Sequence, residues 1–225
     1  MSGILYIVST PIGNLEDITL RAIRIFKEVD LIAAEDTRVT KKLLNHLNIN
    51  KQLISYFEYN KLERGEYLIN LLKEGKNIAL VCDAGTPCIS DSGYLLIDKA
   101  YKNDIKVVSI PGPSSLTASL SISGVNTDRF IFLGFLKKKS SKRKKELERY
   151  KNEDKALVFF ESPHRILQTL MDIKQIFQES FIVITRELTK KFEEVIRGSP
   201  DEVIEYLKSK KILGEFCVII KNMEK

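Results

Sequence analysis

Five clusters of polar and small residues have the composition of a ligand site, and each directly follows an apolar run of strand length. Ligands of open α/β sheets bind beyond the carboxyl ends of the strands, so the position of these clusters indicates a site. The clusters are Ser9–Asn14, Glu35–Arg38, Asp83–Asp91, Pro111–Ser115 and Glu161–Arg165.

The cluster at 83–91 is the most informative of the five. Gly85 has no side chain and Pro87 fixes the turn, so the backbone can approach a ligand closely. A merely structural loop is seldom this long and this poor in bulky side chains. The pattern therefore favours a binding loop.

Charged residues after two strands have both a structural and a functional interpretation. Asp36 can cap the next helix or, with Arg38, contact a substrate or cofactor. Glu161 and Arg165 can contact a ligand, or ion pairs can form among Glu161, Arg165, Arg186 and Glu187. Residue type and position leave these alternatives open.

The absence of several motifs limits the metal sites and cofactor-binding loops that we expect in this chain. The chain has only two histidines and three cysteines and no Cys-x-x-Cys, so we expect no metal site of the zinc type. It contains no Gly-x-Gly and no GxxxxGK[ST]. A nucleotide-like cofactor is therefore expected to bind without a phosphate-cradling glycine loop.

The positive charge is concentrated in one window. Lys and Arg number 36 and Asp and Glu 30, but seven of the nine residues from 137 to 145 are basic. The remainder has 29 basic and 30 acidic residues. The window is typical of a solvated loop, of a nucleic-acid contact or, with less support, of a membrane-surface contact.

The elements that position these clusters alternate between strands and helices. Apolar runs such as 4–8, 31–34 and 78–81 are continuous, as in strands covered on both faces. Residues at helical spacing follow, which predicts an α/β protein with largely parallel sheets. Pro111-Gly112-Pro113 breaks the chain, so we expect an N-terminal α/β domain over 1–112 and a C-terminal one over 113–225.

The expected location of the protein in the cell also follows from the sequence. No apolar run reaches about 18 residues, and the first residues lack the pattern of a signal peptide. The odd number of cysteines, in or beside apolar runs, is typical of reduced thiols. We therefore expect a cytoplasmic protein without a membrane partner.

An ordered set of motifs covers essentially the whole chain: TPIGNLEDIT, LIAAEDTR, DAGTP followed by SDSG, IPGPSS, FLGFL, VFFESPHR and ITRELTKKFEE. With these motifs the sequence closely resembles the ribosomal RNA small subunit methyltransferase I family of the tetrapyrrole methylase superfamily. The resemblance implies two α/β domains of tetrapyrrole-methylase type, a cofactor cleft between them and a homodimer. It also implies S-adenosyl-L-methionine as cofactor and 2′-O-methylation of a cytidine ribose in the decoding region of small-subunit ribosomal RNA.

The resemblance also implies which residues contact the cofactor. In this superfamily the cofactor touches the first-strand loop, the loop after the fourth strand, the hydroxyls after PGP and strand ends of the second domain. The matching residues are Pro11, Ile12, Gly13, Ala84, Gly85, Thr86, Ile89, Ser114, Ser115, Phe160, Glu187 and Leu188.

The catalytic residues are a hypothesis from residue type and position. A ribose hydroxyl is a weak nucleophile that must be held in line and helped to lose its proton. We expect Asp36, Arg38, Glu161 and Arg165 to surround it, with Asp36 or Glu161 as proton acceptor and the arginines holding phosphates. Candidate contacts to the phosphates of the RNA or of the assembled subunit are Lys137, Lys138, Lys139, Lys142, Arg143, Lys144 and Lys145.

Two other functions fit parts of the pattern: a methyltransferase acting on a small tetrapyrrole, and a non-catalytic RNA-binding protein. TPIGN at the first loop, in place of the GxGPGD-like loop of tetrapyrrole enzymes, favours the RNA branch. Asp91-Ser92-Gly93 replaces a common Asp-Pro-Gly. Some members carry a further C-terminal segment, whose RNA contacts we expect to be absent here or supplied otherwise.

Overall fold

The computed structural model describes residues 2–91 and 93–222, and Ser92 of the SDSG motif therefore lies outside the described residues. The chain divides into two compact units, residues 1–114 and 115–225, each of which is described by itself. The division lies two residues after the boundary expected from the Pro-Gly-Pro segment.

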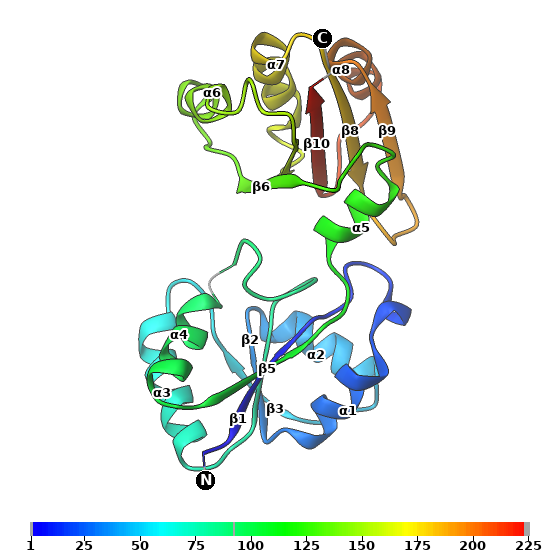
Figure 1. The fold of residues 1–225 in the computed structure, drawn as a ribbon. Coiled ribbons are helices and arrows are strands. Elements are labelled where there is room, and N and C mark those ends of the chain that lie inside the picture. Colours follow the sequence, from blue (N-terminus) through cyan, green and yellow to red (C-terminus); the bar gives the residue numbers. More distant parts are fainter. Residues whose placement is uncertain (1, 92, 223–225) are drawn as a thin grey trace. The chain divides into compact units, whose positions relative to one another are not determined.

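The first unit is a parallel five-stranded sheet in the order β3-β2-β4-β1-β5. Helices α1 and α2 pack on one face and α3 and α4 on the other (Figure 1). Its elements are β1 (Ile4–Val8), a 3-10 turn (Leu15–Asp17), α1 (Leu20–Glu28), β2 (Leu31–Ala34), α2 (Thr37–His46), β3 (Gln52–Ser55), α3 (Lys61–Lys73), β4 (Ile78–Val81), α4 (Tyr94–Lys102) and β5 (Lys106–Ile110).

Parallel pairing decides where the site can form. All four residues of β2 and all four of β4 are buried, because both faces of the sheet are covered. The carboxyl ends of β1, β2, β4 and β5 consequently lie at one edge of the sheet. Polar clusters that are far apart in the sequence meet at that edge.

The second unit has a mixed sheet in the order β6-β7-β10-β8-β9. Only β6 and β7 pair in parallel, and β10 is antiparallel to both β7 and β8. Its elements are α5 (Ser115–Ile122), β6 (Phe130–Phe135), α6 (Ser140–Glu148), β7 (Ala156–Glu161), α7 (Ile166–Ile176), β8 (Ser180–Arg186), β9 (Glu194–Gly198), α8 (Pro200–Lys208) and β10 (Phe216–Asn222).

The expectation of largely parallel sheets is therefore wrong for this unit. β8 and β9 are joined without a crossover helix, so they pair antiparallel. The strands nevertheless read as continuous apolar runs because both faces are covered. Residues of α6, α7 and α8 pack on one face, and α5 packs on the other.

The basic window is largely helical, whereas one interpretation of the sequence was a solvated loop. It forms the loop before α6 and most of α6 itself. Arg143 is buried and forms an ion pair of 2.6 Å with Asp172 of α7. Its guanidinium also donates to the carbonyl oxygens of Lys137 and Lys138. Arg143 therefore anchors the window and is not available to a phosphate, which corrects its assignment as an RNA contact.

Among the residues that the structure describes, every helix is too short or too polar to cross a membrane.

Breaking the Arg143–Asp172 pair is expected to destabilise the protein strongly. Asp172→Ala leaves a buried guanidinium without its counter-charge, which costs about 3–5 kcal/mol of the free energy of unfolding. Arg129→Met, which removes the exposed pair with Asp154, is the control and costs at most about 1 kcal/mol. Urea denaturation measures both, and equal losses would contradict the anchoring role.

Candidate functional site

The loops after β1 and β4 are held together by two backbone hydrogen bonds. Thr10 N donates to Gly85 O at 2.9 Å, and Gly85 N donates to Thr10 O at 3.0 Å. Thr86 Oγ1 lies 2.9 Å from Ser9 Oγ and donates to Pro113 O at 3.0 Å. These bonds join the loops after β1, β4 and β5 into one surface, which we call the clasp.

The clasp brings together most of the cofactor residues expected in the first unit. Pro11 follows the Thr10–Gly85 bridge, and Ile12 Cγ2 lies 3.4 Å from where a Cβ on Gly85 would stand. Gly13 is exposed, and so is Ala84. Ser114 directly follows Pro113, which accepts from Thr86. Ile89 lies further along the β4–α4 loop with its side chain 43% exposed.

The β4–α4 loop has an unusual backbone. Gly85 has φ +86°, and Cys88 and Ser90 also have positive φ although they carry side chains. Asp91 stabilises this conformation by accepting hydrogen bonds from Cys88 N and Gly93 N at 2.8 and 2.9 Å. Such strain clusters at ligand sites, so the loop conformation supports a binding role.

Three carboxylates meet beside the clasp. Asp83 Oδ1 accepts from Asp36 N at 2.9 Å, and Glu35 Oε2 accepts from Asp83 N at 3.3 Å. Burial raises the pKa of Glu35 and of Asp83. The hydrogen bonds from Arg38 instead lower the pKa of Asp36 to about 2. Asp36 is thus a weaker proton acceptor than either neighbour.

Asp36 and Arg38 also have a structural role. Asp36 caps α2 by accepting from Arg38 N at 2.8 Å, and its carboxylate pairs with the Arg38 guanidinium at 2.6 Å. The Arg38 side chain is 87% exposed, which leaves it accessible to a substrate. The two interpretations of the sequence are therefore compatible.

Glu35 and Asp83 are the first residues of two of the clusters, but neither was assigned a role from the sequence. The available signal was position, because each is the first acidic residue after a buried strand. The sequence could not show that Asp83 N donates a hydrogen bond to the carboxylate of Glu35, which lies 48 positions earlier. Among the described residues, no group of three or more His, Cys, Asp or Glu side chains has the geometry to hold a metal ion.

In the second unit, Glu161 has a full set of partners. Its side chain is buried and accepts from Arg165 at 2.6 Å, Thr169 Oγ1 at 2.8 Å and Ser162 N at 2.7 Å. Arg165 in turn donates to Leu136 O at 3.2 Å. This geometry matches the ion-pair interpretation and makes Glu161 a residue that positions Arg165.

The remaining candidates lie at the same end of the second sheet or next to it. Glu187 has φ +50° and accepts from Lys190 Nζ at 2.9 Å, and Leu188 is buried. Phe160 is partly buried, and Ser115 is the first residue of α5. A cleft between the domains, and the grouping of Asp36, Arg38, Glu161 and Arg165 around one hydroxyl, stay predictions.

Comparison with known proteins decides the family. A family model described as tetrapyrrole (corrin/porphyrin) methylases matches residues 4–204. Ribosomal RNA small subunit methyltransferase I of Thermotoga maritima is 47% identical over 99% of this chain and 100% of its own length. The protein of that name from Halalkalibacterium halodurans is 50% identical over 98% of this chain and 76% of its own. This chain belongs to the ribosomal RNA small subunit methyltransferase I family of tetrapyrrole methylases.

Solved structures of this methylase fold agree with the architecture. Diphthine synthase has a TM-score of 0.77 at 15% identity, covering 99% of this chain and 92% of its own. Cobalt precorrin-4 methyltransferase has a TM-score of 0.72 at 13% identity, covering 97% and 94%. At such identities the likeness concerns the fold alone. The family assignment establishes a methyltransferase that uses S-adenosyl-L-methionine.

Replacing Gly85 tests the clasp. Gly85→Ala puts a side chain at φ +86°, against Ile12, and we expect about a tenfold loss of cofactor affinity from the displaced loop. Gly75→Ala, at φ +92° after α3, carries the same backbone strain away from the clasp and is the control. Calorimetric titration with S-adenosyl-L-methionine measures both, and equal affinities would contradict the role of the clasp.

Proposed function

We propose that this methylase transfers a methyl group from S-adenosyl-L-methionine to the 2′-hydroxyl of a cytidine in the decoding region of small-subunit ribosomal RNA. We further propose that it does so as a cytoplasmic homodimer. The observation that carries the proposal is the near full-length identity of 43–50% to proteins named ribosomal RNA small subunit methyltransferase I.

The clasp suits this cofactor chemically. The segments 9–14, 82–89 and 111–114 contain no lysine or arginine, and their one charged residue is Asp83. A cofactor with a sulfonium and an amine but no phosphate needs hydroxyl and backbone contacts and tolerates a carboxylate. The residues proposed to hold it are the twelve cofactor candidates derived from the sequence.

The methyl donor supplies an activated methyl group, and the protein's residues orient the acceptor. We assign the proton acceptor to Asp83, whose carboxylate has a raised pKa and precedes Ala84 and Gly85 of the binding loop. Asp36 orients Arg38, and Glu161 orients Arg165. The two arginines are placed to hold phosphates that flank the ribose.

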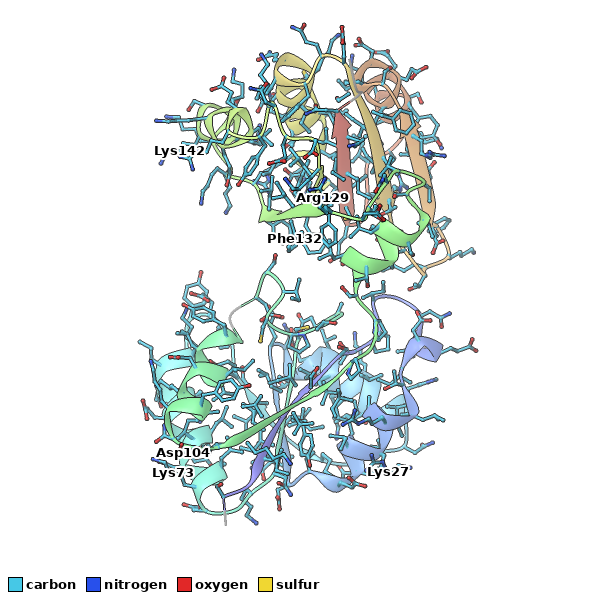
Figure 2. The ribbon with its side chains drawn as sticks, viewed as in Figure 1. Lys27, Lys73, Asp104, Arg129, Phe132 and Lys142 are labelled. Carbon is cyan, nitrogen blue, oxygen red and sulfur yellow. The ribbon has the colours of Figure 1, made fainter. Side chains whose placement is uncertain are left out.

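The RNA contact is proposed for the exposed part of the basic window. Lys137, Lys138, Lys139, Lys142 and Lys145 are exposed, and Lys144 is half-buried. Lys142 projects from α6 on the second unit (Figure 2). Because Arg143 is anchored to Asp172 and donates to the carbonyl oxygens of Lys137 and Lys138, α6 and the segment before it present these lysines as one cationic surface.

Substitution of Asp83 tests the chemistry. We expect Asp83→Asn to slow single-turnover methylation by roughly 10²–10⁴-fold and to leave cofactor affinity unchanged, because only proton removal is lost. The ionised carboxylate is the active form, so the wild-type rate falls as pH drops through the raised pKa. Asp83→Asn flattens that decline.

Asp98→Asn, on the exposed surface of α4, is the matched control. The assay uses labelled methyl groups and small subunits from a strain lacking the methylase, with mapping of the modified nucleotide. Transfer to a tetrapyrrole alone would exclude the RNA function. Unchanged rates in Ala variants of Asp36, Arg38, Glu161 and Arg165 would exclude their proposed roles.

Neutralising the lysines before α6 is expected to weaken RNA binding and its salt dependence. Each phosphate contact to single-stranded RNA contributes about 0.7 to the magnitude of the slope of log affinity against log salt. The triple variant with Gln at Lys137, Lys138 and Lys139 therefore lowers the magnitude of this slope by up to about 2. Lys27, Lys73 and Lys102→Gln, on the first unit, makes the same change in net charge and is the control. Equal slopes in the two triple variants would show that the window is a solvated surface without RNA contacts.

A further inference from the structure

An unusual feature of the second unit is a bulge in the edge strand β6. The register pairs Phe132 with Val158 and Phe135 with Phe160, so β6 uses three steps where β7 uses two. Gly134, at φ +61°, provides the left-handed residue that the bulge requires. A bulge of this kind re-aims the side chain that follows it.

The bulge changes the face on which Phe135 lies. Along a regular strand, Phe135 would share the face of Ile131 and Leu133, which pack toward the core under α7. Instead the centroid of its ring lies 5.6 Å from that of Phe160, and the ring of Phe132 lies 5.1 Å from that of Phe160. Phe160 and Phe132 belong to the α5 face of the sheet.

Three aromatic rings therefore meet on a part of the sheet that α5 leaves open. α5 contacts the core formed by β7, β8 and β10 on this face, but Phe135 keeps 55% of its surface exposed. Exposing a phenylalanine loses hydrophobic stabilisation, so the bulge does not serve the core. An exposed ring supported by two partly buried ones, beside polar surface, is typical of an interaction site.

Adjacent charge indicates the partner. Phe135 is followed after one buried residue by the exposed Lys137, Lys138 and Lys139. Arg165 binds the carbonyl oxygen of that intervening residue, Leu136, which fixes the lysines relative to the ring. Aromatic rings next to a row of cations are the combination that binds single-stranded nucleic acid, with bases stacked on rings and phosphates beside lysines.

We propose that Phe135, supported by Phe132, is a stacking platform for an unpaired base of the RNA substrate. The inference deepens the proposed function, on which it rests, by making single-stranded or flipped-out RNA the form that is recognised. Base-paired RNA cannot offer a free base face to this platform and is expected to bind only through the lysines.

The test measures binding of a short single-stranded RNA that contains 2-aminopurine, with the full-length protein. Phe135→Ala is expected to weaken binding about tenfold and to abolish the stacking-induced quenching, with an unchanged salt slope. Phe135→Trp retains both. Phe130→Ala, at a 40% exposed position on the same strand, is the matched control and leaves affinity unchanged.

Besides unchanged RNA binding by Phe135→Ala, three results would overturn the platform. They are an equal loss in Phe130→Ala, a loss of cofactor affinity rather than RNA affinity in Phe135→Ala, or a change in its sedimentation mass that makes the ring a contact between copies. Methyl transfer is scored separately. Normal transfer and normal RNA binding by Phe135→Ala would exclude the platform alone, whereas Phe135-dependent RNA binding without transfer to cytidine would exclude the proposed function alone.

Discussion

The two hydrogen bonds between Thr10 and Gly85 are the constraint on which the first unit's site depends. They are possible because Gly85 adopts φ +86°, which brings its backbone against the loop that follows β1. Thr86 then links Ser9 to Pro113, so three strand ends share one surface. The strain at Cys88 and Ser90 lies in the same loop and is compensated by the carboxylate of Asp91. A parallel sheet aligns the strand ends, and these few hydrogen bonds join the loops that follow them into the clasp.

In the second unit the corresponding constraint is burial of charge. Arg143 and Asp172 form a buried pair between α6 and α7, and Glu161 holds Arg165 beneath the loop after β6. Both pairs lie on the side of the sheet that α6 and α7 cover, where an isolated charge would be costly. Arg143 holds the backbone of Lys137 and Lys138, and Arg165 holds that of Leu136, the residue after Phe135. The charged residues that the sequence suggests as substrate contacts therefore form two groups. One group is proposed to contact the substrate, and the other positions neighbouring residues.

Much of the fold was predictable because buried strands leave continuous apolar runs. β2 and β4 were visible for that reason, whereas β3 (Gln52–Ser55) and β9 (Glu194–Gly198) were missed. Both missed strands are edges of their sheets and carry polar residues, Gln52 and Ser55 in β3 and Glu194 and Arg197 in β9, so neither has a continuous apolar run. The antiparallel position of β10 was also unpredictable. Its apolar run is the same as that of a parallel central strand, since both faces are covered.

The sequence by itself determined the family, the cofactor chemistry and the loops that carry the candidate site, because ordered motifs and the missing phosphate loop are local properties. Only the tertiary structure decided which member of each charged cluster is free to act. Arg143 is one of seven basic residues in the sequence until Asp172 is seen beside it, and Asp83 is one residue of a polar loop until its hydrogen bonds with Asp36 and Glu35 are seen. The state of a charge depends on burial and on partners that lie tens of residues away, and composition does not encode those distances. Likewise, only the register of β6 against β7 shows that Phe135 lies beside Phe160 on the α5 face of the sheet, because a one-residue bulge cannot be inferred from the order of the residues.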